Sequence, residues 1–139
     1  MKVSEAPAQT RGSGPYVGLR PFEEDERDLF FGRDRDARFV CDKVHSSRLT
    51  LLYAQSGTGK TSLLRAIVRS QLEQEDMLVI SYDDWTGDRP LAELKDKICR
   101  VAEAEGVVDP GAGAPEIMDL VRLITIASGR TVALILDQF

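Results

Sequence analysis

An apolar run that breaks into a glycine-rich turn and then into an apolar-periodic helix most restricts the fold of this chain. The run covers residues 49–53, and the turn reads Ala54-Gln-Ser-Gly-Thr-Gly-Lys-Thr-Ser62. Such a turn points successive backbone N–H groups inward, and so forms a concave place for phosphate oxygens at a helix N-terminus. Gly57 and Gly59 supply backbone conformations that a side chain would obstruct. The sequence therefore predicts a phosphate-binding loop between a strand and a helix.

The end of this loop carries the groups that a nucleoside triphosphate site requires. Lys60 is placed to reach the β- and γ-phosphates, and the Thr61 hydroxyl is placed to ligate Mg²⁺. The strict pattern opens with Gly, whereas this chain has Ala54; a small residue suffices there if its φ angle stays negative. We expect the nucleotide phosphates to be held by Gln55, Ser56, Gly57, Thr58, Gly59, Lys60, Thr61 and Ser62.

Length and composition fit one small soluble unit. The 139 residues leave room for a single core, and 42% hydrophobic with 29% charged residues is ordinary for a globular domain. The net charge of −5 argues against a surface that coats nucleic acid. With no signal-like start and no apolar run of transmembrane length, a cytoplasmic protein without a membrane partner is the default expectation. Cys41 and Cys99 are too few for a disulfide framework or a zinc site.

The chain divides into a leader and an α/β body. Residues 1–15 are rich in Ser, Gly, Pro, Ala and Gln and are expected to be disordered, whereas residues 16–139 form the body. Hydrophobic spacing and boundary residues predict helices over 34–45, 60–72, 90–106 and 116–127, and strands over 49–53, 77–82 and 131–137.

Two single residues admit both a functional and a structural interpretation. His45 is expected to be a C-terminal helix residue rather than a catalytic base. Trp85 follows the second strand; it could touch a ligand, but anchoring the loop between that strand and the next helix is favoured.

The last predicted strand completes the nucleotide site. Its almost uninterrupted apolar run, residues 131–136, is typical of a strand buried on both faces. Asp137 would emerge at its carboxyl end, where it can hold Mg²⁺, commonly through a water, opposite Thr61. We assign catalytic roles to Lys60 and Asp137, and metal-holding roles to Thr61 and Asp137. The expected fold is α/β, a three-layer P-loop NTPase of the ASCE type with a parallel sheet.

Four segments together resemble the novel STAND NTPases, signal-transduction ATPases related to the NACHT and apoptotic ATPases. They are Tyr16-Val-Gly-Leu-Arg-Pro-Phe22, Phe30-Phe-Gly-Arg-Asp34, the loop with its following leucines, and Leu134-Ile-Leu-Asp-Gln-Phe139. The resemblance implies Mg²⁺ with ATP or ADP as ligands, and contacts from Phe31, Gly32 and Arg33 to adenine and ribose; Phe31 could equally be plain core. It also implies ATP-driven self-association beside effector and sensor domains.

The chain departs from that family at its end. Members continue past Asp-Gln-Phe with acidic residues, one of which would polarise the attacking water. Related ATPases also insert a downstream strand between the P-loop strand and the strand that ends in Asp. We therefore expect a domain truncated at the Walker B strand, with a sheet incomplete at its C-terminal side and unpaired edges.

The predicted function is a nucleotide-dependent switch that binds Mg·ATP or Mg·ADP and hydrolyses little. The guanine-reading pattern Asn-Lys-x-Asp is absent from the sequence. A conventional P-loop enzyme, such as a small-molecule kinase, and a non-catalytic scaffold that retains the site by descent remain as alternatives.

Overall fold

A computed structural model describes residues 32–110, 112–113 and 115–138. The elements are α1 (Asp34–Ser46), α2 (Lys60–Leu63), the π-helix η2 (Leu64–Val68), α3 (Arg69–Gln74), β1 (Leu78–Tyr82), α4 (Pro90–Ala104), α5 (Ile117–Ser128) and β2 (Val132–Leu136). α2, η2 and α3 follow one another without a break and together form the helix predicted after the loop. The predicted leader, the segment from residue 16 to 22 and Phe31 lie outside the described residues.

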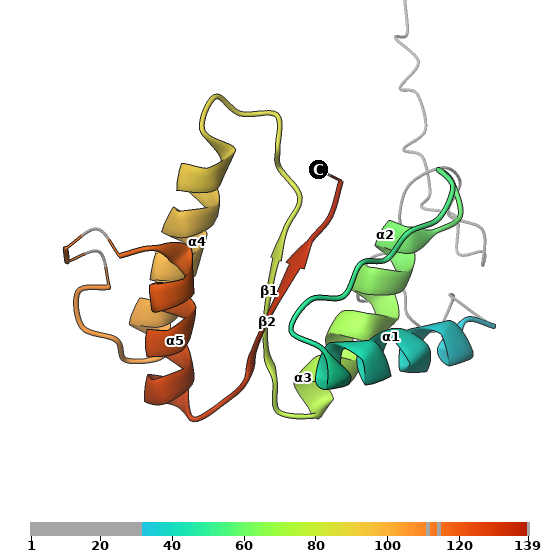
Figure 1. Cartoon of the computed structure of the whole chain (residues 1–139), viewed down its shortest axis with the longest axis horizontal. Helices are drawn as coiled ribbons and strands as arrows, with labels where there is room; N and C mark the ends of the chain where they lie inside the picture. The colour runs from blue at the N-terminus through green and yellow to red at the C-terminus, as the bar shows by residue number, and fades with distance from the viewer. Residues whose placement is uncertain (1–31, 111, 114, 139) are drawn as a thin grey trace, which may run out of the picture.

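Helices cover both faces of a small parallel sheet (Figure 1). β1 pairs with β2, with Leu78 opposite Val132 and Tyr82 opposite Leu136. α4 and α5 lie on one face, and α1 lies with the continuous α2–η2–α3 helix on the other. The three-layer α/β arrangement is thus present, with two strands in the sheet of the described residues.

The two strands divide their side chains between two cores, as the period of two in a strand requires. Val79 and Ala133 pack with α1 and the α2–η2–α3 helix, around Leu63, Ile67 and Leu72. Leu78, Ile80, Tyr82, Val132 and Leu134 pack on the other side with the buried residues Leu94, Ile98, Leu120 and Ile124 of α4 and α5. The sheet therefore joins two helical layers that each bury their own apolar stripe.

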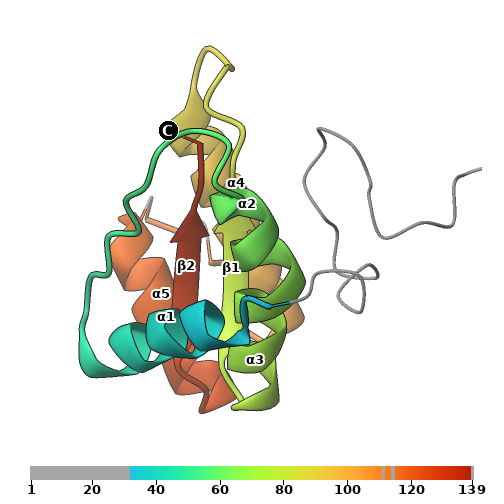
Figure 2. The same cartoon turned by 90° about the vertical axis from the view of Figure 1, so that its right-hand side faces the viewer.

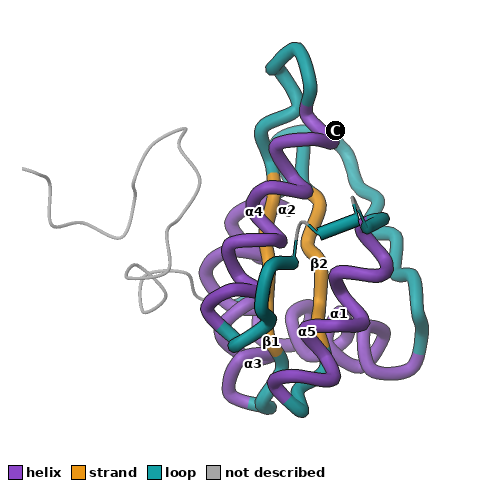
Figure 3. The backbone as a smooth tube through the Cα atoms, turned by 90° about the vertical axis from the view of Figure 1, so that its left-hand side faces the viewer, coloured by secondary structure: helices purple, strands orange, loops and turns teal. Residues whose placement is uncertain are grey.

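The prediction of a first strand over residues 49–53 is wrong. This segment has no strand pairing and runs beside β2, on the side away from β1 (Figures 2 and 3). Leu49, Leu51 and Tyr53 are 87%, 77% and 91% exposed. An extended segment needs a neighbouring strand for its backbone groups, and the described residues supply none between this segment and β2. The unpaired edge expected from the sequence is present at this place.

Two predictions of burial also fail. β2 is not fully buried: Ala133 is buried, whereas Leu136, the last residue of the strand, is 40% exposed. The spacing of Leu91, Leu94, Ile98 and Val101 predicts one apolar stripe on the helix that begins at residue 90. Leu94 and Ile98 are buried in α4, whereas Leu91 is exposed in the first turn.

Other predictions for the helices are confirmed. Helical spacing places Ala37, Val40, Cys41 and Val44 on one face of the first helix, and the first three form the buried face of α1. His45 lies in the last turn of that helix, where its ring contacts the Glu75 carboxylate. No helix within the described ranges is long and apolar enough to cross a membrane.

Candidate functional site

The glycine-rich turn has the backbone shape that the sequence predicts. Gly57 and Gly59 adopt φ angles of +79° and +78°, in the left-handed region that favours glycine. A Cβ on Gly57 would meet no atom within 4 Å, so its requirement is conformational and not steric. Gly59 directly precedes α2, and its carbonyl accepts a hydrogen bond from the N–H of Leu63 at 2.9 Å. The turn therefore leads straight into the helix.

The Lys60 side chain folds back over this turn. Its ammonium group donates to the carbonyl oxygens of Ala54 at 2.7 Å and Gln55 at 2.9 Å. The Thr58 hydroxyl donates to the same Gln55 carbonyl at 2.8 Å. These three contacts close the loop on itself and place a positive charge across it. Phosphate oxygens, which are stronger acceptors than neutral carbonyls, would compete for that ammonium group.

Arg33, the residue before α1, forms a hydrogen bond to the backbone of the loop. Its guanidinium donates to the carbonyl of Thr58 at 2.5 Å and forms an ion pair with Asp36 of α1 at 2.8 Å. The resemblance assigns Arg33 to the adenine and ribose, and the structure adds this contact, which sequence reasoning missed. The preceding Gly32 has a left-handed φ of +84° and is exposed.

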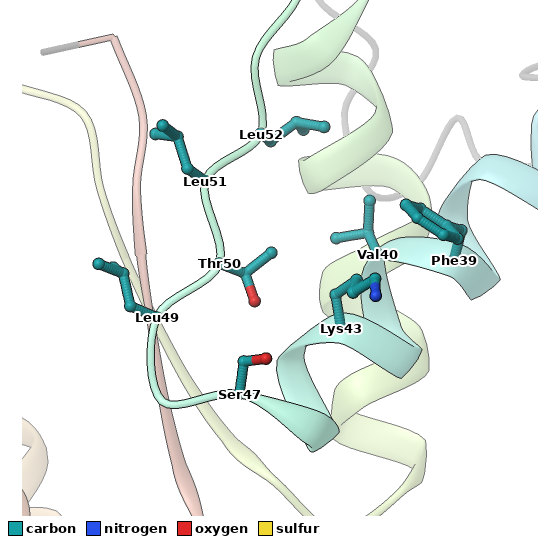
Figure 4. A pocket seen from close by; sticks show the side chains of 8 residues that line it. All are labelled: Phe39, Val40, Lys43, Ser47, Leu49, Thr50, Leu51 and Leu52. Carbon is teal, nitrogen blue, oxygen red and sulfur yellow. The ribbon is translucent and has the colours of Figure 1, made fainter.

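A hollow lies beside the loop rather than in it. It has a volume of about 270 Å³ and is lined by α1 and the segment before the loop, namely by Phe39, Val40, Lys43, Ser47, Leu49, Thr50, Leu51 and Leu52. Figure 4 shows the Thr50 and Leu52 side chains pointing toward the helices, and Leu49 and Leu51 pointing the opposite way, toward β2. Most of the lining residues are apolar, and the glycine-rich turn follows the lining segment along the chain.

The chain after β2 ends at the same end of the molecule as the loop and the start of α2 (Figures 1 and 2). Asp137 is the first residue after β2. One carboxylate oxygen, Oδ1, accepts the N–H of Gln138 at 3.0 Å. The other, Oδ2, is buried and has no hydrogen-bond partner within the part of the chain that the structure describes. Buried polar atoms are nearly always paired, so this oxygen fits a cation or a cation-bound water.

A metal at Asp137 would depend on few protein ligands. The described residues hold no group of three or more His, Cys, Asp or Glu side chains suited to a metal ion. Its remaining ligands would be the Thr61 hydroxyl, phosphate oxygens and water, a set that suits Mg²⁺. The pairing of Thr61 with Asp137 around a metal stays a prediction.

The acidic residues after β1 are engaged elsewhere. Asp83 forms an ion pair with Arg65 of η2, and Asp84 accepts a hydrogen bond from the Thr86 hydroxyl at 2.8 Å. Trp85 donates its indole N–H to the carbonyl of Asp137 at 2.7 Å, which confirms its predicted role as an anchor. The pairing of Arg65 with Asp83 has no signal in the spacing of the sequence.

A comparison with protein-family models identifies one that covers most of the chain. The model described as Novel STAND NTPase 1 matches residues 15–139, a range that includes the loop, Arg33 and Asp137. No solved structure gives a significant match. On this match, and with the loop geometry described above, the chain belongs to the Novel STAND NTPase 1 family.

Proposed function

We propose that this chain binds Mg·ATP and Mg·ADP at residues 54–62 and acts as a nucleotide-dependent switch module in a signalling or defence assembly. The observation that carries the proposal is the position of Lys60, whose ammonium group spans a turn built on two left-handed glycines at a helix start. Membership of the family supports a nucleotide-binding signalling module. Self-association, or contact with effector and sensor domains in the cytoplasm, is part of the same proposal.

In this proposal, different residues would bind the phosphates, the metal and the base. Lys60 would bind the β- and γ-phosphates, and the N–H groups of the turn would bind the remaining phosphate oxygens. Thr61 and Asp137 would hold Mg²⁺, which neutralises charge on the β- and γ-phosphates when bound. Arg33 contacts the carbonyl of Thr58, and its place beside the loop supports a nucleotide contact from Gly32 and Arg33.

Titration with fluorescent nucleotides tests the proposal. We expect Mg·ATP and Mg·ADP to bind more tightly than Mg·GTP, because the sequence has no guanine-reading motif. Lys60→Ala removes a charge-assisted contact worth about 1.5–3 kcal/mol, so affinity should fall roughly tenfold or more. Lys97→Ala on the exposed face of α4 is the matched control and should change nothing.

Two outcomes would contradict parts of this proposal. Equal or tighter binding of GTP would remove the adenine assignment and leave the phosphate site in place. Unchanged Mg·ATP affinity in Lys60→Ala, with Lys97→Ala also unchanged, would show that the nucleotide does not bind at this loop.

A further inference from the structure

The backbone of Asp137 is held on both sides of its Cα atom. Its N–H donates to the carbonyl of Tyr82 at 2.9 Å, which extends the contact between β1 and β2 by one residue beyond the strands. Its carbonyl accepts the indole N–H of Trp85 at 2.7 Å, from a residue 52 positions earlier in the chain. The backbone at this point is therefore fixed by two bonds to one neighbouring segment, residues 82–85.

The chain changes direction immediately afterwards. Gln138 adopts a left-handed φ of +60°, which is unusual for a residue with a side chain, and its N–H bonds back to Oδ1 of Asp137. This leaves Oδ2 buried and unpaired among the described residues. The direction in which that oxygen points depends on the orientation of the Asp137 peptide, and so on the bonds that hold it.

The indole of Trp85 is itself rigidly placed. Its ring meets the ring of Tyr82 edge-on, with centroids 4.9 Å apart and planes at 89°. Tyr82 is 6% exposed, and its hydroxyl donates to Glu93 of α4 at 3.3 Å. Trp85 also packs against the core that α4 and α5 form with the sheet. The donor therefore keeps one position because its apolar body is packed.

We propose that Trp85 is a positioning residue for the metal-holding carboxylate: its indole N–H fixes the Asp137 peptide and so aims Oδ2 at the Mg²⁺ of the bound nucleotide. The inference rests on the proposed function, because the metal arrives with the nucleotide. A general stabilising role of Trp85 would not act on Mg²⁺ binding in particular. The positioning role predicts that removal of the indole N–H lowers the affinity for Mg²⁺ and leaves the affinity for metal-free nucleotide, which depends on the loop, unchanged.

Mg²⁺ titration at saturating fluorescent ADP tests the coupling. Trp85→Phe keeps an aromatic ring against Tyr82 and removes the N–H donor. We expect Mg²⁺ affinity to fall about three- to tenfold, the effect of one lost hydrogen bond, with metal-free ADP affinity unchanged. Tyr82→Phe is the matched control, because it keeps the ring and the backbone carbonyl and should leave Mg²⁺ affinity unchanged. Asp137→Asn should show the larger loss.

A second measurement uses the unmodified chain and so does not depend on the variant folding. Trp85 is the single tryptophan in the sequence, so its indole N–H gives one nuclear magnetic resonance signal. In the ADP-saturated chain, Mg²⁺ should shift this signal, and the shift should be lost in Asp137→Asn.

The outcomes separate this inference from the proposed function. Unchanged Mg²⁺ affinity in Trp85→Phe together with a loss in Asp137→Asn would overturn the role of Trp85 and leave nucleotide binding intact. An indole N–H signal that does not shift when Mg²⁺ is added to the ADP-bound chain would also overturn the role of Trp85. A chain that binds no nucleotide either with or without Mg²⁺ would instead remove the proposed function, and the inference with it.

Discussion

The Cys41 thiol shows how burial sets the chemistry of one residue. Its side chain is 4% exposed between α1 and the α2–η2–α3 helix, with Sγ 3.4 Å from Oε1 of Gln71. Burial, assisted by the negative charges of Glu75 and Asp42, raises the pKa of Cys41 from 9.0 to about 11. The neutral thiol is therefore favoured in the folded chain far above its ordinary range.

This shift predicts a loss of stability in alkaline solution. A folded-state pKa above the unfolded one gives stability that is complete below pH 9.0 and is lost as the pH rises through about 11. The full loss from this group is about 3 kcal/mol. Urea unfolding at pH 9 and at pH 11 measures the free energy of unfolding at each end of this range. It should decline more between the two pH values in the parent chain than in Cys41→Ala, whose other titrating groups are the same. Parallel declines in the two proteins would contradict the assignment to Cys41.

Single residues were predictable from the sequence where their role is local. Gly57, Gly59 and Lys60 belong to one turn, and their backbone angles and contacts follow from the order of the residues in it. The contact from Arg33 to the Thr58 carbonyl spans 25 residues, and that from Trp85 to Asp137 spans 52. Such bonds arise when the layers pack, so no local pattern indicates which donor meets which carbonyl.

Whole elements were predictable where their stabilising partners lie within the described residues. The helices and the strands β1 and β2 agree with their predicted ranges to within about two residues, because each buries a periodic apolar face. Residues 49–53 have an equally apolar composition but form no strand. Backbone pairing requires two segments, and the described residues supply no second one between residues 49–53 and β2.

Arg130 lies between α5 and β2, at the end of the sheet opposite the loop, and contacts the segments that follow α3 and α4. Its guanidinium donates to the carbonyl of Met77 at 3.0 Å, and it forms ion pairs with Asp76 at 3.3 Å and Glu105 at 3.8 Å. Asp76 has a left-handed φ of +62°, so Arg130 also holds the turn between α3 and β1 in an unfavourable backbone conformation.

We expect Arg130→Ala to lower the free energy of unfolding by about 1–2 kcal/mol, through lost hydrogen bonds to partly buried carbonyl groups. Chemical denaturation measures the effect. The control is Arg122→Ala on the exposed side of α5, which should stay within about 0.5 kcal/mol of the parent. Equal effects of the two substitutions would show that the bonds of Arg130 contribute nothing beyond those of a surface arginine.

In the described residues the two helical layers meet through a two-stranded sheet, and the loop, the start of α2 and the chain after β2 lie at the same end of it (Figure 1). The loop belongs to the layer of α1 and α2, whereas Trp85 belongs to the layer of α4 and α5. Asp137 lies between them, bonded to the segment that follows β1. A bound nucleotide with its metal would therefore contact both helical layers at this end of the sheet.

This arrangement predicts a chain that binds nucleotide better than it hydrolyses it. In the proposed function, Lys60, Thr61 and Asp137 would place phosphates and metal, but hydrolysis also requires a group that orients the attacking water. The acidic residues after β1 are unsuited to that role, because Asp83 is paired with Arg65 and Asp84 with Thr86. Missing general-base assistance costs a factor of ~10²–10⁴ in rate.

Phosphate release from Mg·ATP by residues 1–139 should therefore stay near the uncatalysed background under conditions that saturate nucleotide binding. The measurement needs the Asp83→Asn and Asp84→Asn variants beside the parent chain, and a longer chain that continues past residue 139 with the acidic residues of its family. The two variants should match the parent, and the longer chain should release phosphate measurably faster. The opposite result has two parts: the parent chain would release phosphate as fast as the longer chain, and the rate would fall in the Asp83→Asn or the Asp84→Asn variant. That result would show that the water-orienting group lies after β1.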